Sequence, residues 1–391
     1  MNSSPAGTQD LDPQELGPQE RLHLARALQL AANGLYTTDP NPRVGCVLVR
    51  DELVVGEAWH VRTGEPHAEV LALRAAGSRA AGATAFISLE PCSHSGHTPP
   101  CADALIAAGI TRVLCCTRDP NPRVAGAGVE RLRAAGITVS VGGLAQDARQ
   151  LNVGFFSRHE RSRPYVRLKI GMTLDARTTP AGGGSAWITG EEARADVQIL
   201  RARSSAILTG AGTVRVDDPR LDVRLGYGPW VRQPLRVVLD PELSVASTAR
   251  IFQKNGALVF ASPDARQPSN AHEQQPNALE QQLGSGRRVE RVPMAGSGLN
   301  LHAVLARLNE LEVNELLVEC GPRLAGALLQ AELVDEMVLY VAPTLLGSDA
   351  APLALLSGLP RWPAFEFHDV RRIGADLRLI LRPATPIAGK R

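Results

Sequence analysis

The sequence predicts a protein of two α/β domains. Its 391 residues are more than one hydrophobic core usually organises. Strand and helix patterns alternate in both halves, which is typical of a sheet covered on both faces by helices. Near residues 150–164 this pattern gives way to polar and basic residues, so we place the domain boundary there. We predict a disordered tail at residues 1–18, a first domain at 19–150 and a second at 163–386.

The first half begins with a helix over residues 20–32, where apolar residues recur every three or four positions. Strands 44–49 and 53–59 form a hairpin, and a helix follows from Pro66 to Ala76. The remaining predicted elements are strands at 84–89, 112–116 and 137–141 and helices at 101–108 and 124–135.

The second half repeats the alternation. Strands are predicted at 165–170, 206–209, 236–239, 257–260, 315–319 and 336–341, the last of which closes the domain, and helices at 191–203, 301–311 and 324–333. Residues 262–288 are rich in Gln, Pro, Asn and Ser without periodicity, so we expect a surface loop there.

Composition favours small-molecule chemistry in the cytoplasm. A net charge of +2 is too small for the strongly basic face that gripping nucleic acid usually needs. The chain has no apolar run of the ~18 residues that a membrane helix requires, and its polar N-terminus lacks signal-peptide features. We expect no nucleic-acid or membrane partner and a homo-oligomer. Six cysteines in such a chain favour metal binding or burial over disulfides.

The strongest chemical signal is the pattern His67-Ala68-Glu69, then Pro91-Cys92, then Cys101. One imidazole and two thiolates supply three ligands for Zn²⁺ and leave the fourth position for water. Glu69 can act as general acid and base on that water without being a ligand. A structural zinc is the alternative, but it would need a fourth ligand such as His94 or His97.

This pattern is the signature of zinc-dependent nucleobase deaminases, although here eight residues rather than two separate the cysteines. The segment Leu89–His94, with Gly96 and Thr98–Cys101, resembles the deaminase domain of the bifunctional riboflavin-biosynthesis deaminase/reductase family. Supporting segments are Asn41–Gly45, Gly56-Glu57, His60, Gly64–Glu69 and Asp119–Pro122. The resemblance implies a cytidine-deaminase-like three-layer domain whose substrate pocket includes Asn41, His60, His94 and His97. His97 stands where that family usually has Arg or Lys.

The second half resembles the reductase domain of the same family, which has a dihydrofolate-reductase-like α/β fold. The residues that carry the resemblance include Leu168-Lys169, Leu174-Asp175, Trp187–Thr189, Arg194, Asp217–Pro219, Asp240 and Gly321-Pro322. It implies an NADPH site made by Gly171, Trp187, Thr213, Asp217, Gly321, Pro322, Arg323, Leu324, Ala325, Gly326 and Ala327. The implied substrate contacts are Ser185, Arg201, Leu221, Arg224 and Glu319, and Lys169, on an interior strand, is a further candidate.

Two features of the second half bear directly on its chemistry. The strand, Gly turn and helix start at Val318–Leu324 expose backbone N–H groups to an anion, without a Gly-x-Gly-x-x-Gly fingerprint. Arg201 and Arg224 suit a phosphorylated substrate because a guanidinium pairs bidentately with phosphate. The sequence departs from the family at Ala176, where Gly is usual, and at Gly183-Gly184.

We therefore predict a bifunctional enzyme of riboflavin biosynthesis. It would deaminate 2,5-diamino-6-(5-phosphoribosylamino)pyrimidin-4-one with Zn²⁺ and then reduce the ribosyl side chain to ribityl with NADPH. One alternative is a single-function zinc deaminase with a non-catalytic second domain. Another is a nucleic-acid-editing deaminase, which needs stacking aromatic residues that make up only 4% of this chain.

Overall fold

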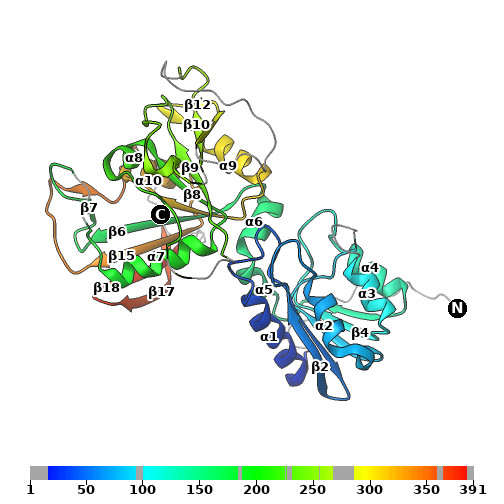
Figure 1. Cartoon of the computed structure of the whole chain (residues 1–391). Helices are drawn as coiled ribbons and strands as arrows, with labels where there is room; N and C mark the ends of the chain where they lie inside the picture. Colours follow the sequence, from blue (N-terminus) through cyan, green and yellow to red (C-terminus); the bar gives the residue numbers. More distant parts are fainter. Residues whose placement is uncertain are drawn as a thin grey trace. The chain divides into compact units, whose positions relative to one another are not determined.

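The computed structural model divides the chain into two compact units, Met1–Ser162 (unit 1) and Arg163–Arg391 (unit 2) (Figure 1). It describes residues 16–93, 100–183, 187–224, 226, 231–254, 256–266, 286–358 and 364–384. The predicted site residues His94, His97 and Ser185 lie outside these ranges, as do residues 1–15 of the predicted tail. Both units are α/β, which confirms the predicted fold class.

Unit 1 is built on a sheet with the strand order β2-β1-β3-β4-β5. β1 is antiparallel to both β2 and β3, whereas β3, β4 and β5 run parallel. The strands are β1 (Gly45–Arg50), β2 (Leu53–Trp59), β3 (Thr84–Ile87), β4 (Arg112–Cys115) and β5 (Thr138–Val141). The helices are α1 (Pro18–Ala32), α2 (Ala68–Ala76), η1 (Gly77–Ala80), α3 (Cys101–Ala107), α4 (Ala127–Ala134), α5 (Ala145–Leu151) and α6 (Val153–Arg161).

Alternating side chains of this sheet supply two cores, which gives the unit three layers. Leu48, Ile87 and Val113 pack with apolar residues of α2, α3 and α4. Their strand neighbours Val47 and Phe86 point the other way and pack against α1 and α5. Successive residues of a strand face opposite sides, so each strand serves both layers.

Two parts of unit 1 differ from the sequence prediction. Leu16, placed in the predicted tail, is buried in the core beside α1. The polar stretch predicted as the boundary forms α5 and α6, and Phe155 and Phe156 of α6 pack against Leu89. The apolar residues of α6 occupy its first four positions and a run of polar and charged residues follows, so the segment resembles a linker in the sequence although it forms an amphipathic helix.

Unit 2 is built on a nine-stranded sheet with the order β11-β10-β9-β8-β14-β6-β15-β18-β17 in its described residues. The strands from β11 to β15 in this order run parallel to their neighbours, and β18 and β17 are antiparallel. Its members are β6 (Tyr165–Thr173), β8 (Ala206–Gly210), β9 (Leu235–Leu239), β10 (Ala257–Ala261), β11 (Arg287–Arg291), β14 (Glu315–Glu319), β15 (Glu336–Ala342), β17 (Phe365–Ile373) and β18 (Asp376–Pro383). Short pairs are β7 (Arg177–Thr179) with β16 (Ala351–Pro352) and β12 (Met294–Ala295) with β13 (Gly298–Leu299).

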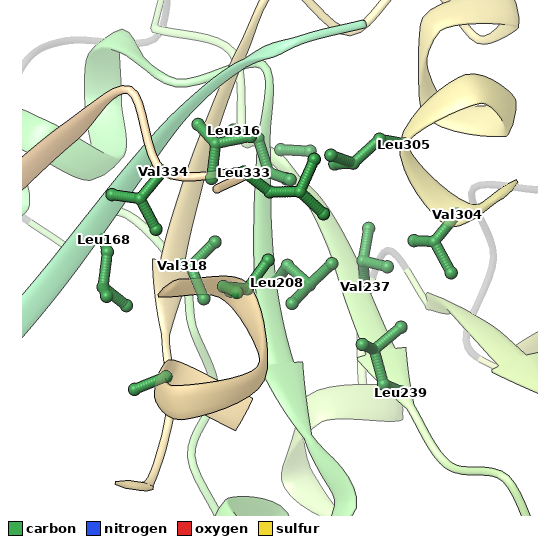
Figure 2. Packing of buried hydrophobic residues seen from close by; sticks show 14 of the residues in the cluster. Leu168, Leu208, Val237, Leu239, Val304, Leu305, Leu316, Val318, Leu333 and Val334 are labelled. Atoms are coloured by element: carbon green, nitrogen blue, oxygen red, sulfur yellow. The ribbon is translucent and has the colours of Figure 1, made fainter. Parts of the chain in front are cut away.

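Helices cover both faces of this sheet. They are α7 (Glu191–Arg203), α8 (Ala211–Asp217), η2 (Arg250–Phe252), α9 (Leu301–Glu310) and α10 (Pro322–Gln330). One core joins Leu168, Leu208 and Val318 of the strands to Val304 and Leu305 of α9 (Figure 2). The other core joins the alternate strand residues to α7 and α8.

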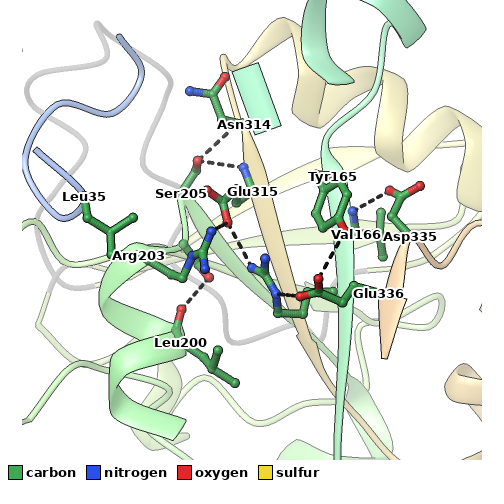
Figure 3. A network of polar contacts seen from close by, with 12 residues as sticks. Leu35, Tyr165, Val166, Leu200, Arg203, Ser205, Asn314, Glu315, Asp335 and Glu336 are labelled. Atoms are coloured by element: carbon green, nitrogen blue, oxygen red, sulfur yellow. Dashed lines mark hydrogen bonds and ion pairs between the residues drawn. The ribbon is translucent and has the colours of Figure 1, made fainter. Parts of the chain in front are cut away.

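Charged residues are buried in the sheet at the amino ends of its central strands. Arg167 on β6 donates from Nη1 to Glu315 at 3.0 Å and from Nε to Glu336 at 2.6 Å. Arg203 pairs with Glu315 at 2.9 Å (Figure 3). Because each buried charge has an oppositely charged partner, the desolvation cost is offset within the protein.

Two findings in unit 2 go beyond the prediction. The sheet does not close at β15, because β17 and β18 add an antiparallel hairpin at its edge. Residues 267–285 of the predicted surface loop lie outside the described ranges, and the stretch that follows them contains β11. Among the helices that the structure describes, none has the length and apolar character needed to cross a bilayer.

Candidate active sites

Three metal-ligating side chains of unit 1 converge at the starts of two helices. His67 is the residue before α2, Cys101 is the first residue of α3, and Cys92 lies beyond the end of β3. Their ligand atoms all lie within 4.8 Å of one another, with His67 Nδ1 3.2 Å from Cys101 Sγ and 3.6 Å from Cys92 Sγ. This donor set of one nitrogen and two sulfurs suits Zn²⁺ and leaves a fourth position for water.

The surroundings favour a thiolate at Cys92. The pKa of this thiol is lowered to about 4, first by its hydrogen bond with Cys101 and further by that with His67, although burial acts in the opposite direction. The backbone N–H of Cys101 also donates to Cys92 Sγ at 3.4 Å. A thiolate is the form of cysteine that binds a metal, so the protein prepares this ligand electrostatically.

Glu69 lies in the first turn of α2, two residues after His67, and is buried. Burial raises the pKa of its carboxyl to about 6. Its Oε2 atom is buried without a hydrogen-bond partner among the described residues. A buried carboxylate oxygen of this kind needs a partner, and a water beside the three ligands would provide one.

Asn41 and His60, which family resemblance predicts to line the substrate pocket, lie next to this cluster. His60 Nδ1 lies 3.2 Å from the carbonyl oxygen of Pro66, so this nitrogen carries the proton and Nε2 accepts. Asn41 Nδ2 donates to His60 Nε2 at 3.1 Å. The rings of His60 and His67 meet edge to face with centroids 5.2 Å apart. Burial lowers the pKa of His60, which keeps the imidazole neutral.

Glu90, to which the sequence analysis gave no role, fixes the segment that carries Cys92. Its carboxylate accepts four backbone N–H groups at 3.0–3.1 Å, from Asp119, Gly126, Gly128 and Val129. Two of these belong to the first turn of α4, so Glu90 caps that helix from a distant segment. A Cβ on Gly128 would lie 1.9 Å from the Pro91 carbonyl oxygen, so only glycine allows this contact. The one sequence signal was a carboxylate directly before Pro91-Cys92.

Unit 2 contains a cavity of about 1880 Å³. Its lining includes most of the predicted reductase residues: Lys169, Gly171, Trp187, Arg201, Thr213, Asp217, Leu221, Arg224, Glu319, Gly321, Pro322, Arg323, Leu324 and Ala327. Ala325 and Gly326 are not part of the lining. Ala325 is buried in the core, and a Cβ on Gly326 would lie 1.9 Å from the carbonyl oxygen of Leu355. These two residues therefore serve helix packing.

A group of paired charges stands on the cavity wall. Glu319 accepts from Arg201 Nε at 2.6 Å and Nη2 at 3.0 Å, and Lys169 Nζ lies 3.1 Å from the same carboxylate. Burial alone would raise the pKa of Glu319, but the two cations hold it at about 2. Arg201 is thus already engaged. The Arg224 side chain is 52% exposed, and its Nε lies 3.4 Å from the Asp222 carboxylate.

Other lining residues had no assigned role in the sequence analysis. Arg194 stacks over the Trp187 ring at 4.8 Å, and Tyr340 of β15 reaches the cavity from the sheet. Leu221, by contrast, is one of the predicted substrate contacts; it lines the cavity and adopts φ +48°, a left-handed conformation that is strained for leucine. Single residues of this kind carry no spacing signal in the sequence.

Known proteins match both units. The model of the cytidine and deoxycytidylate deaminase zinc-binding region matches residues 18–117, and the RibD C-terminal domain matches residues 164–379. The riboflavin biosynthesis protein RibD of Escherichia coli (strain K12) is 48% identical over 376 residues, which are 93% of this chain and 99% of that protein. RibD of Haemophilus influenzae is 41% identical and covers 94% and 99%.

Solved structures agree with these relatives. Form 1 of Acinetobacter baumannii RibD has a TM-score of 0.82 and 41% identity, covering 94% of this chain and 99% of that one. A Thermotoga maritima diaminohydroxyphosphoribosylaminopyrimidine deaminase/5-amino-6-(5-phosphoribosylamino)uracil reductase has a TM-score of 0.79 and 32% identity over the same shares. Both units of this chain are matched by these two-domain proteins, so a single-function deaminase with a non-catalytic second domain is not favoured. The chain belongs to the RibD family of bifunctional riboflavin-biosynthesis enzymes, with a zinc-dependent deaminase domain followed by an NADPH-dependent reductase domain.

Proposed function

We propose that unit 1 deaminates 2,5-diamino-6-(5-phosphoribosylamino)pyrimidin-4-one and that unit 2 reduces the ribosyl side chain of the product to ribityl. One observation carries this proposal: a His–Cys–Cys cluster beside a buried glutamate and a large cavity with charged walls occur in one chain. The Thermotoga maritima deaminase/reductase, whose structure matches 94% of this chain, is named for the same two substrates, which supports this proposal.

In unit 1, His67, Cys92 and Cys101 would hold the zinc ion. Bound in this way, zinc lowers the pKa of a water molecule at the open position toward about 7. Glu69 takes a proton from the attacking water and returns it to the departing amino nitrogen. Water adds to the ring carbon, ammonia leaves, and the ring gains a carbonyl oxygen. A carboxyl with a pKa of about 6 can do both, because its two protonation states are close in free energy near neutral pH.

Asn41 and His60 would orient the pyrimidine ring beside Glu69, together with His94 from the sequence before Cys101. His97 would meet the substrate phosphate. The neutral His60 is held by Pro66 and Asn41 at fixed distances, so it offers a rigid contact to the ring.

In unit 2, NADPH supplies the hydride. The cofactor would be bound by residues that line one cavity: Gly171, Trp187, Thr213, Asp217, Gly321 and, from the start of α10, Pro322, Arg323, Leu324 and Ala327. Lys169, Ser185, Arg201, Leu221, Arg224 and Glu319 would bind the substrate. Both arginines have carboxylate partners, but Arg201 is buried and doubly bonded to Glu319, whereas Arg224 is exposed and lies 3.4 Å from Asp222. Arg224 is therefore the better-placed cation for the substrate phosphate.

We further propose that the enzyme is a cytoplasmic homo-oligomer. β17 is the edge strand of the unit 2 sheet and exposes Phe367 and Val370, with Leu377 on β18. An exposed apolar edge is a common site of self-association. Light scattering should show a smaller particle for Phe367→Lys than for the unmodified protein.

The assay that tests the two activities uses the diaminopyrimidine phosphate with and without NADPH. Without NADPH, ammonia should be released and the deaminated ribosyl compound should accumulate. With NADPH, cofactor oxidation should follow ammonia release and reach the same amount. If deaminated substrate never oxidises NADPH, the second unit is not a reductase.

A further inference from the structure

The β17–β18 hairpin contacts helix α7, which contributes to the wall of the reductase cavity, at two points. Asp376, the first residue of β18, meets the start of α7, and Arg378 of β18 meets the middle of the same helix. Neither Asp376 nor Arg378, which make these contacts, lines the cavity. Any effect of these residues on the reductase must therefore act through the elements they hold.

The first contact fixes the segment that precedes α7. Asp376 is buried, and its Oδ2 accepts the backbone N–H of Gly190 at 2.7 Å. Gly190 is the N-cap residue of α7, and the preceding residues Trp187 to Thr189 line the cavity. A carboxylate at a helix N-terminus is favoured by the helix dipole, and its bond to a backbone N–H is of the stronger, charge-assisted kind.

The second contact reaches the cavity wall through one intermediate. Arg378 Nη1 donates to Asp196 of α7 at 2.9 Å, and Asp196 Oδ2 accepts the hydroxyl proton of Tyr340 at 2.5 Å. Tyr340 lines the cavity. Arg378 also donates to Asp369 of β17 at 3.1 Å, so this chain of contacts is anchored in both strands of the hairpin.

We propose that Asp376 and Arg378 are positioning residues of the reductase. Asp376 holds the Trp187–Gly190 segment in the conformation that meets the cofactor, and Arg378 holds Tyr340 through Asp196. This inference rests on the proposed function, because it takes the cavity to be the NADPH and substrate site. It predicts that the hairpin governs the affinity of the reductase for NADPH, although it contributes no group to the reaction.

The test removes the Asp376 contact from either side and measures the KM for NADPH with deaminated substrate. Asp376→Ala deletes the acceptor, and Asp376→Asn keeps an oxygen that can accept. Gly190→Pro deletes the donor at a φ of −66° that proline adopts, and its Cδ displaces the Asp376 carboxylate from the position it now occupies, so the contact is broken from the other side. Gly190→Ala keeps the donor, and its Cβ would lie no closer than 3.5 Å to any neighbour. Glu366→Ala removes an exposed charge from the same hairpin as a control.

We expect Asp376→Ala and Gly190→Pro each to raise the KM for NADPH about tenfold while kcat changes much less. Asp376→Asn, Gly190→Ala and Glu366→Ala should stay within about threefold of the unmodified enzyme, and ammonia release should be unchanged in all five. Arg378→Met should raise the KM for NADPH as well, because Tyr340, which Arg378 holds through Asp196, is paired in the sheet with Gly171 of the proposed cofactor site. Circular dichroism verifies that each variant folds. If Asp376→Ala does not fold, the KM of Gly190→Pro for NADPH tests the inference in its place.

The inference is overturned if the KM for NADPH is unchanged in both Asp376→Ala and Gly190→Pro. It is also overturned if the KM for NADPH rises as much in Asp376→Asn as in Asp376→Ala. Failure of the proposed function would look different, because the unmodified chain itself would then not oxidise NADPH with deaminated substrate.

Discussion

The two candidate sites are assembled in opposite ways. The deaminase cluster comes from two short segments, and the ligand atoms of its three central residues lie within 4.8 Å of one another. The reductase cavity of about 1880 Å³ draws its wall from residues between Lys169 and Leu355. Metal coordination fixes residue type and spacing, whereas a cofactor cavity is shaped largely by backbone and by the ends of elements. Single substitutions should therefore matter far more in the first site than in the second.

The largest effect is expected for Cys92→Ser. The zinc content should fall from about one per chain to near zero, and deamination should drop by more than about 10³-fold, because two protein ligands do not hold the metal. Metal analysis and ammonia release measure both. Cys320→Ser, which removes a thiol from unit 2, is the matched control and should keep its zinc. Full zinc in Cys92→Ser would show that the cluster is not the metal site.

Glu69→Gln should have the next largest effect. The amide has nearly the same shape but cannot shuttle a proton, so deamination should fall by about 10²-fold or more while zinc stays bound. The same protein supplied with deaminated substrate should oxidise NADPH at the normal rate, which serves as the internal control. Near-normal ammonia release would remove Glu69 from the mechanism.

In the reductase, Glu319 should show a smaller effect that depends on pH. Its folded-state pKa of about 2 lies below the ordinary value of 4.5, so its stabilisation is present above about pH 4.5 and is lost as the pH falls toward 2. The difference corresponds to about 3 kcal/mol. Urea unfolding of unit 2 across this range should show the loss, and Glu319→Gln should flatten it. Glu366→Gln, which removes an exposed carboxyl, should leave the pH dependence of the unfolding free energy unchanged. If Glu366→Gln flattens that dependence as Glu319→Gln does, the assignment to Glu319 is wrong.

The sequence predicted most of the fold because each central strand and helix has a clear apolar pattern. It failed at two places. α6 buries Phe155 and Phe156 directly before a run of polar and charged residues, and β17 exposes most of its side chains at the sheet edge. A charged run and an exposed edge strand both resemble a loop in the sequence, so the tertiary contacts that fix these elements become visible only in the structure.

The candidate sites were predictable to different degrees for a related reason. His67, Glu69, Cys92 and Cys101 form a recognisable chemical pattern, and the structure brings them together. For unit 2, family resemblance rather than pattern named the residues, and it included Ala325 and Gly326, which face away from the cavity. Supporting residues such as Glu90, Asp376 and Arg378 act through backbone or through a second side chain, and no local sequence pattern reveals such contacts.

The smallest expected effect concerns Ala176, where the family usually has glycine. Ala176 has φ +56°, a left-handed conformation in the turn after β6 that costs an L-residue roughly 1–2 kcal/mol. Glycine removes this strain but loses more entropy on folding, by roughly 0.5–1 kcal/mol, so Ala176→Gly should stabilise unit 2 by about 0.5–1 kcal/mol. The melting temperature should rise by about 1–4 °C. Ala306→Gly, at an exposed position inside α9, should instead lower it, because glycine costs about 1 kcal/mol within a helix. A calorimetric scan in which Ala176→Gly melts at or below the unmodified protein would show that this turn does not strain alanine.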